Sequence, residues 1–154
     1  MNFASYISGF VDGEGCFSVS FNFREKLKIG IEVRPSFSIG QNARSLSLLK
    51  DIKKFFHCGS IRFSKKDQCY KYEVRNILNL NKYILPHFKN YPLCSSKRRD
   101  YELFEEVCNK IIQKEHLDKN GLKRIIFLAY EMNEFGKKRY RKEEFLTALN
   151  KVKI

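Results

Sequence analysis

Residues 6–15, which read Tyr-Ile-Ser-Gly-Phe-Val-Asp-Gly-Glu-Gly, constrain the fold of this chain more than any other stretch. Apolar residues follow the helical spacing i, i+3, i+4 at Ile7, Phe10 and Val11, which predicts a helix with one apolar stripe. Small residues recur every four positions along another side of the same helix: Ser5, Gly9 and Gly13. A stripe of small residues lets two helix backbones approach closely, so we expect this helix to pack against a second helix along that side.

Glu14 comes where the helical periodicity ends, with Gly13 before it and Gly15 after it. Glycines at the end of a helix supply the positive φ angles that stop it, so the helix is expected to end here. A lone glutamate after a helix is ordinarily a solvated loop residue. The two flanking glycines and the adjacent stripe of small residues favour a functional acid instead.

Beyond Gly15 the apolar residues alternate with polar ones, which is typical of half-buried strands. Four antiparallel strands are expected, over residues 16–24, 28–39, 61–64 and 69–75. Pro35 cannot donate a backbone hydrogen bond, so the second strand is expected to bend or to lie at a sheet edge there. Each strand has one apolar side and one polar, mainly basic side.

Helical periodicity returns between and after these strands. Asn42 is a suitable N-cap for a helix over residues 46–56, and Asn79 for a shorter helix over residues 80–88 that ends near Pro92. Further helices are expected over residues 97–114, 118–132 and, more weakly, 145–152, the last after the basic stretch 137–142. The first seven elements give an αββαββα order in an α+β fold. The helices are expected to cover the apolar side of the sheet and to leave its polar side open.

The composition limits the class of protein. A length of 154 residues with 43% hydrophobic residues fits one folded domain. The 30 lysines and arginines exceed the 17 aspartates and glutamates, and the formal charge of +13 favours a polyanionic partner such as nucleic acid. No apolar run approaches the ~20 residues of a membrane span, and no targeting peptide is expected, so we expect no membrane partner. The five cysteines lack C-x-x-C spacing, which predicts reduced thiols and no zinc site.

The stretch 7–14 resembles the signature of the LAGLIDADG homing endonucleases, with Ser8 as its small residue. Later segments resemble further blocks of the single-motif, organellar members of that family: Tyr91-Pro92-Leu93 followed by Lys97, Asp100 to Phe104, Lys114 to Leu117, Gly121-Leu122 and Met132-Asn133. The resemblance covers the chain up to about residue 133, which leaves a basic helical tail over about residues 134–154 within a single domain 1–154. It implies the LAGLIDADG fold, in which two antiparallel sheets form a saddle on DNA.

The resemblance also implies a homodimer. The chain has one copy of the signature, and hence one well-placed acid, whereas two-metal phosphodiester hydrolysis needs carboxylates on both sides. A two-fold axis would bring two catalytic Glu14 residues together, with a backbone carbonyl of Gly13 as a further metal ligand. Hard oxygen ligands suit Mg²⁺, which is the expected cofactor. The dimer contact is expected along the signature helix, at Ser5, Ser8, Gly9 and Asp12.

Alignment with the family assigns further active-site residues one at a time. Lys97, five residues after a proline, stands at the family's basic position, where it would offset charge in the transition state. Gln41, at the end of the second strand, aligns with a polar residue that orients the nucleophilic water. A second basic residue of the family falls on Ser45, with Arg44 beside it, so this chain departs from the pattern there. Asp12 matches the signature, and its place favours capping or positioning of the helix end over metal binding.

DNA is expected to bind on the polar side of the sheet. The serine, asparagine and charged side chains there can read base-edge donors and acceptors in the major groove. A merely solvated sheet face would carry a more even mixture of charges than this mainly basic one. The expected DNA-binding residues are Ser18, Ser20, Asn22, Arg24, Lys28, Glu32, Arg34, Ser38, Arg62, Ser64, Lys71 and Arg75.

Two classes of function stay open from the sequence. The first is a site-specific DNA endonuclease that cuts both strands of a long pseudo-palindromic target as a homodimer. The resemblance implies that such a protein is encoded in an organellar intron and works in the mitochondrion or chloroplast. The second is a binding protein on the same fold, either an intron RNA maturase that binds its own intron RNA or a non-cleaving DNA-binding regulator. Glu14 favours the enzyme, because a carboxylate beside phosphates weakens binding unless a cation intervenes.

Overall fold

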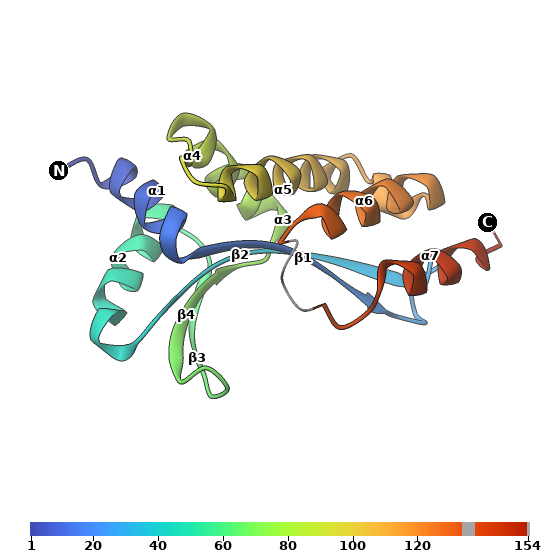
Figure 1. Ribbon diagram of the computed structural model, residues 1–154, viewed down its shortest axis with the longest axis horizontal. Coiled ribbons are helices and arrows are strands. Elements are labelled where there is room, and N and C mark those ends of the chain that lie inside the picture. Colours follow the sequence, from blue (N-terminus) through green and yellow to red (C-terminus); the bar gives the residue numbers. More distant parts are fainter. Residues whose placement is uncertain (134–137, 154) are drawn as a thin grey trace.

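The computed structural model describes residues 1–133 and 138–153, so Lys137 of the expected basic stretch lies outside the described residues. The described residues form one four-stranded sheet with helices packed against it (Figure 1). The elements in chain order are α1 (Phe3–Glu14), β1 (Gly15–Phe23), β2 (Ile31–Gln41), η1 (Ala43–Ser45), α2 (Leu46–Phe56), β3 (Ser60–Ser64), β4 (Cys69–Val74), α3 (Ile77–Asn79), the π-helical turn η2 (Leu80–Ile84), α4 (Leu85–Asn90), α5 (Lys97–Ile112), η3 (Glu115–Leu117), α6 (Lys119–Glu131) and α7 (Lys142–Asn150). The expected αββαββα order and the additional C-terminal helices are confirmed. Among the described helices, none has both the length and the apolar character that crossing a membrane requires.

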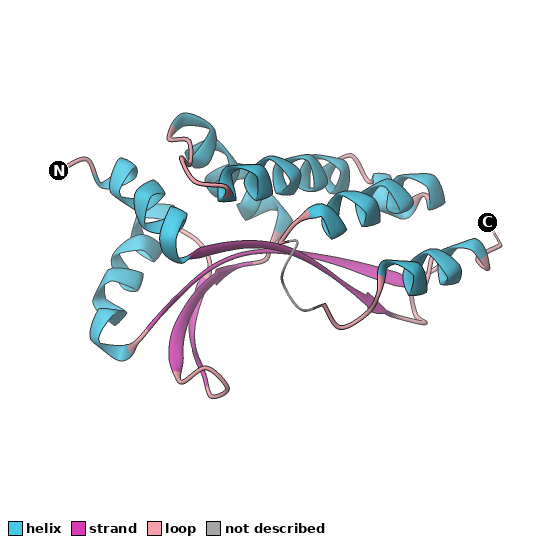
Figure 2. Ribbon diagram, in the orientation of Figure 1, coloured by secondary structure: helices cyan, strands magenta, loops and turns pink. Residues whose placement is uncertain are grey.

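The strand order in the sheet is β1-β2-β4-β3, and every neighbouring pair is antiparallel. β2 pairs with β1 from Ile31 to Ile39 but with β4 only from Phe37 to Gln41. Among the described residues, Pro35 therefore lies where one edge of β2 has no partner strand, which agrees with the edge placement expected for this proline. Figure 2 shows α4, α5 and α6 together on one side of the sheet, which curves away from them so that its other side is concave.

The apolar side of the sheet is buried against these helices in two clusters. Phe17 of β1 is fully buried in the larger cluster. Its ring centroid lies 5.2–5.5 Å from the rings of Phe37, Phe88, Tyr101 and Phe104. This cluster ties the start of β1, and with it the end of α1, to α4 and α5.

α7 closes the smaller cluster beside the β1–β2 turn (Figure 1). Its Phe145 lies 5.4 Å from Phe21 and 4.8 Å from Phe23, measured between ring centroids. Aromatic pairs of this kind contribute about 0.5–1.5 kcal/mol each beyond the area they bury. Packing against β1 therefore stabilises a helix whose own periodicity is weak, and the tail segment Lys142–Asn150 is part of the fold.

Several expected boundaries were wrong by a few residues: α7, expected over residues 145–152, is Lys142–Asn150, and α5, expected to end at residue 114, ends at Ile112. Two other differences have local reasons. Residues 24–30 form a hydrogen-bonded turn before β2 begins, so Lys28 lies in that turn rather than in the strand. After β4 the helical course begins at Ile77, because the Asn76 side chain accepts a hydrogen bond from the backbone N–H of Asn79 at 3.1 Å. Asn79, expected as the N-cap, lies inside the helical run.

Candidate functional site

Glu14 is the last residue of α1 and is exposed. Within residues 1–133 and 138–153 its carboxylate has no hydrogen-bond or ion-pair partner. The expectation that glycines with positive φ end this helix was wrong, because Gly15 has a φ of −85°. Gly15 is needed for space instead, since a Cβ there would lie 2.5 Å from Cγ1 of Val11. The chain thus passes directly from α1 into β1 and leaves Glu14 at the junction.

Lys97 is the first residue of α5 and lies against the last turn of α1. Its Nζ donates a hydrogen bond to the backbone carbonyl of Val11 at 2.9 Å, and the backbone N–H of Gly15 bonds to the same carbonyl. The dipole of a helix favours a cation at the C-terminal end. The hydrogen bond from the first residue of α5 therefore holds an ammonium group beside the helix end that carries Glu14.

Asp12 joins α1 to the turn before α5. Its carboxylate accepts hydrogen bonds from the backbone N–H groups of Cys94 and Ser95, at 2.8 and 3.0 Å, and from the Ser95 hydroxyl at 2.7 Å. Oγ of Ser95 in turn accepts a bond from the backbone N–H of Lys97 at 3.2 Å. Burial raises the pKa of Asp12, but these hydrogen bonds and the charge of Lys97 together lower it by more. The pKa of Asp12 therefore lies below its ordinary value. The ionised carboxylate of Asp12 is therefore occupied in holding the turn that leads to Lys97.

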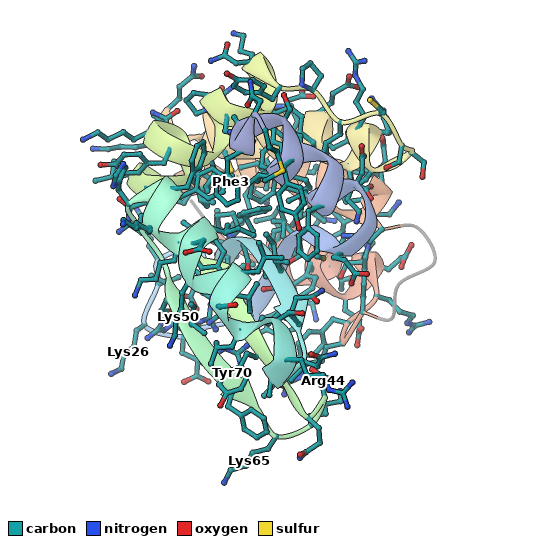
Figure 3. All side chains as sticks on the ribbon, turned by 90° about the vertical axis from the view of Figure 1, so that its left-hand side faces the viewer. Phe3, Lys26, Arg44, Lys50, Lys65 and Tyr70 are labelled. Carbon is teal, nitrogen blue, oxygen red and sulfur yellow. The ribbon has the colours of Figure 1, made fainter. Side chains whose placement is uncertain are left out.

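Gln41 is the last residue of β2 and is partly exposed. The chain then turns through η1, where the Asn42 side chain accepts a hydrogen bond from the backbone N–H of Arg44 at 3.0 Å. Arg44 is exposed and Ser45 is partly buried, and Figure 3 shows Arg44 at this end of α2. In the part of the chain that the structure describes, neither Gln41 nor Arg44 is joined to Glu14 by a hydrogen bond or ion pair.

The polar side of the sheet brings most of the expected DNA-binding residues onto one face. The register pairs Ser20 with Arg34 across β1 and β2, and Arg62 with Lys71 across β3 and β4. Directly paired residues in a sheet point to the same side. The expected residues that lie within strands on this face are Ser18, Ser20, Asn22, Glu32, Arg34, Ser38, Arg62, Ser64 and Lys71.

Three of the expected DNA-binding residues lie outside the strands, and two of the serines within the strands are largely buried. Arg24 and Arg75 directly follow β1 and β4, while Lys28 is exposed in the β1–β2 turn. Ser38 and Ser64 are only 5% and 9% exposed, and the Ser64 hydroxyl donates a hydrogen bond within the β3–β4 turn at 2.9 Å. Little of either side chain is exposed, and their direct contact with DNA stays a prediction.

Sequence reasoning missed one residue of this face. Alternation along β4 places Glu73 on the polar side, but it gives no sign that the carboxylate is buried. In the structure Glu73 is 9% exposed and forms ion pairs with Arg62 and Arg75. Arg75 stands two residues after Glu73 in the chain, whereas the register of β3 with β4 brings Arg62 to the same carboxylate.

The model of the LAGLIDADG endonuclease family matches residues 7–108 of the chain. This chain belongs to the LAGLIDADG endonuclease family. It is 32% identical to the archaeal intron-encoded homing endonuclease I-Vdi141I, solved in complex with DNA, with a TM-score of 0.89 over 97% of this chain and 95% of that chain. It is 34% identical to I-SmaMI, solved bound to an uncleaved DNA target in the presence of calcium ions, with a TM-score of 0.86 over 96% of this chain and 49% of that chain.

The family also includes longer relatives. The probable intron-encoded endonuclease 2 of Neurospora crassa is 36% identical to this LAGLIDADG chain over 124 residues, which is 80% of this chain and 26% of that protein. The chain thus spans about a quarter of the length of the curated relatives that it matches first. The resemblance drawn from the signature and the fold that it implies are confirmed.

α1 is the LAGLIDADG helix of this chain, and its stripe of small residues faces outward. Ser5, Gly9 and Gly13 are exposed, and a Cβ added at either glycine would meet nothing within 4 Å. Ser8, expected on the same contact face, points into the protomer instead. It is 5% exposed, and its hydroxyl donates to the backbone carbonyl of Tyr91 at 2.7 Å and lies 3.2 Å from Nε2 of His87. Its place in the dimer contact is therefore corrected.

Proposed function

We propose that this LAGLIDADG chain is a site-specific DNA endonuclease that works as a homodimer and cuts both strands of a long target by metal-dependent hydrolysis. One observation carries the proposal. An exposed carboxylate without a partner among the described residues, Glu14, ends a helix with an open small-residue stripe, beside the ammonium group of Lys97. A protein that only bound nucleic acid would gain nothing from an acid at this place.

The homodimer is supported by the coverage of the two solved relatives. The chain corresponds to nearly all of the I-Vdi141I chain but to only 49% of the I-SmaMI chain. Two copies of this chain would therefore match the extent of one I-SmaMI chain. The stripe at Ser5, Gly9 and Gly13 supplies a surface on which two copies of α1 can approach closely about a two-fold axis.

The donor groups at the end of α1 fit a hard divalent cation. One chain alone is insufficient, because no cluster of three His, Cys, Asp or Glu side chains able to hold a metal occurs among the residues described here. Two copies of Glu14 and the backbone carbonyl of Gly13 would provide the oxygen ligands that suit Mg²⁺. When bound, the cation would supply Lewis-acid stabilisation of charge on the phosphate oxygens.

The chain's own residues account for the rest of the chemistry. Lys97, held against Val11, would place a positive charge where negative charge develops on the scissile phosphate. Gln41 would orient the attacking water by hydrogen bonding, and Arg44 would provide the second basic group from the position next to Ser45. The resemblance to the family and the positions of α5 and η1 support these proposed roles.

The polar side of the sheet would track the duplex. β2 has 11 residues, and at about 3.3 Å per residue it spans about 36 Å. A duplex rises about 3.4 Å per base pair, so one copy would follow on the order of ten base pairs and a homodimer roughly 20. The names of the relatives support an origin within an intron, and we propose that the protein works in the organelle where it is made.

A selection of cleaved sites from a randomised duplex library with Mg²⁺ tests the proposal. We expect a long, pseudo-palindromic site. Glu14→Gln should keep duplex binding and lower cleavage by at least about 10³-fold, the equivalent of several kcal/mol of charge stabilisation. Glu106→Gln, the same change at an exposed position of α5, is the matched control and should cleave normally.

Two results would contradict the proposal. Undiminished cleavage by the Glu14→Gln variant would show that the Glu14 carboxylate takes no part in hydrolysis. A preference for structured RNA over duplex DNA, with no selected site, would favour an intron RNA maturase or a regulator instead.

A further inference from the structure

Glu73 is a buried acid on the sheet face that otherwise carries mainly basic and hydroxyl groups. It lies on β4, paired with Ser38 of β2 on one side and Ser60 of β3 on the other. The two small neighbours leave room beside it for longer side chains, and Glu73 itself is only 9% exposed. The carboxylate therefore lies close to the backbone of the sheet, below the outer ends of the side chains that a ligand would contact.

Arg75 forms a two-point ion pair with this carboxylate. Its Nε lies 2.9 Å from Oε1 of Glu73, and its Nη2 donates to Oε2 at 3.3 Å. The Ser36 hydroxyl donates to the same Oε2 at 3.3 Å, and Nε of Arg62 lies 3.7 Å from Oε1. Two-point arginine–carboxylate pairs fix the plane of the guanidinium group as well as its position.

The two arginines remain available to a ligand. Their side chains are 52% exposed for Arg75 and 49% exposed for Arg62, in contrast to the buried acid between them. A guanidinium group has five N–H donors in a rigid fork, and the pair with Glu73 uses one on Nε and one on Nη2 of Arg75. The unused donors on Nη1 and Nη2 point away from the carboxylate. They form the edge that reads O6 and N7 of guanine in the major groove.

An acid in a phosphate-binding face has an electrostatic cost, because it repels the same polyanion that the face attracts. A flexible arginine, by contrast, loses side-chain entropy when a ligand immobilises it. An acid that holds the arginine in place before binding removes much of that loss and restricts the arginine to one geometry. Glu73 would therefore lower the affinity for any duplex and increase the discrimination between base pairs.

We propose that Glu73 is a positioning residue that fixes Arg75 and Arg62 for base reading, with Arg75 selecting guanine. The proposal rests on the proposed DNA-binding function of the sheet face. It assigns sequence discrimination to a residue that itself touches no DNA.

The first test uses the free protein and needs no DNA. Nitrogen-15 NMR of arginine Nε–H groups reports how strongly each side chain is held, and Arg75→Lys assigns the Arg75 signal. We expect a protected, well-dispersed Arg75 signal in the native chain. Glu73→Gln should move it to the position and fast exchange of free arginines. An Arg75 signal that is already averaged in the native chain would overturn the proposal.

The second test measures the ratio of affinities for the selected duplex and a scrambled duplex of equal length, at fixed salt. Glu73→Gln should reduce this ratio about tenfold, the typical discrimination of one two-point base contact, with unchanged or tighter binding to the scrambled duplex. The lost preference should concentrate at one guanine in each half-site, and Arg75→Lys should lose the same preference. Asp51→Asn, which removes one exposed acid from α2, is the matched charge control and should keep the ratio.

The outcomes separate this proposal from the proposed function. A ratio within twofold of the native value in Glu73→Gln would overturn the role of Glu73, and so would an equal loss of affinity for both duplexes. A native chain that binds both duplexes equally would refute the proposed function and the base-reading role together. The NMR result would still decide whether Glu73 holds Arg75.

Discussion

Replacement of Asp12 by alanine tests whether the junction between α1 and the turn before α5 positions Lys97. The change removes three hydrogen bonds, of 2.7, 2.8 and 3.0 Å, that tie Asp12 to Cys94 and Ser95. Because the site is open to solvent, each bond contributes about 0.5–1 kcal/mol rather than the larger value of a buried charged bond. The free energy of unfolding should therefore fall by about 1.5–3 kcal/mol. For a domain of this size the melting temperature should fall by about 5–10 °C.

Cleavage should fall by more than this loss of stability explains. Misplacement of a catalytic group by about 1 Å can cost about 100-fold in rate, and Lys97 is held in the same network as Asp12. We expect a loss of that size in single-turnover cleavage by Asp12→Ala, measured at a temperature and protein concentration at which the variant is folded. Affinity for the selected duplex should change by less than about threefold, because the sheet face is untouched. Asp12→Asn keeps one acceptor oxygen, so its cleavage rate should lie between those of the native protein and Asp12→Ala.

Asp118→Ala is the matched control. It removes a comparable cap, the hydrogen bond of 3.0 Å from the backbone N–H of Gly121 to Asp118 at the start of α6, without touching α1 or Lys97. It should cost about 1 kcal/mol of stability and leave the cleavage rate of the folded protein unchanged. Equal cleavage by the two alanine variants, once both are fully folded, would refute the positioning role of Asp12. Parallel loss of DNA binding in Asp12→Ala would refute it as well.

Three further predictions concern the assembly, the interface and the core. Gly9→Val should dissociate the homodimer in sedimentation velocity, because a β-branched side chain on the open stripe of α1 would separate the two helices; an intact, active dimer would exclude that contact. The logarithm of the DNA-binding constant should fall with the logarithm of salt concentration at a slope near −9 if on the order of ten phosphates are contacted, and a slope near zero would contradict a phosphate-tracking face. Burial lowers the pKa of His87 to about 4, so the unfolded chain binds more protons between that value and about 6.5. Stability should therefore decline as the pH falls through this window, and His87→Gln should make that decline shallower in urea titrations; an identical pH dependence would show that His87 does not contribute.

The sequence by itself determined the type and order of the main helices and strands, the two sides of the sheet and the identity of the candidate acid. These features depend on the spacing of neighbouring residues. The alternation along β1 sorts Phe17 to one side and Ser18 to the other whatever packs against them. The small-residue stripe of α1 and the place of Glu14 in the signature are local in the same sense.

The tertiary structure alone decided which polar groups meet and which are hidden. Asp12 bonds to Ser95, and the hydroxyl of Ser8 turns inward to His87, because α1 packs against segments some 80 residues away in the chain. The register of three strands places small residues on both sides of Glu73 and brings Ser36 and Arg62 to its carboxylate. Apart from the Glu73–Arg75 pair, whose members are two residues apart, these hydrogen bonds and ion pairs join groups that no local period relates. Their geometry is set only when the helices and strands have packed.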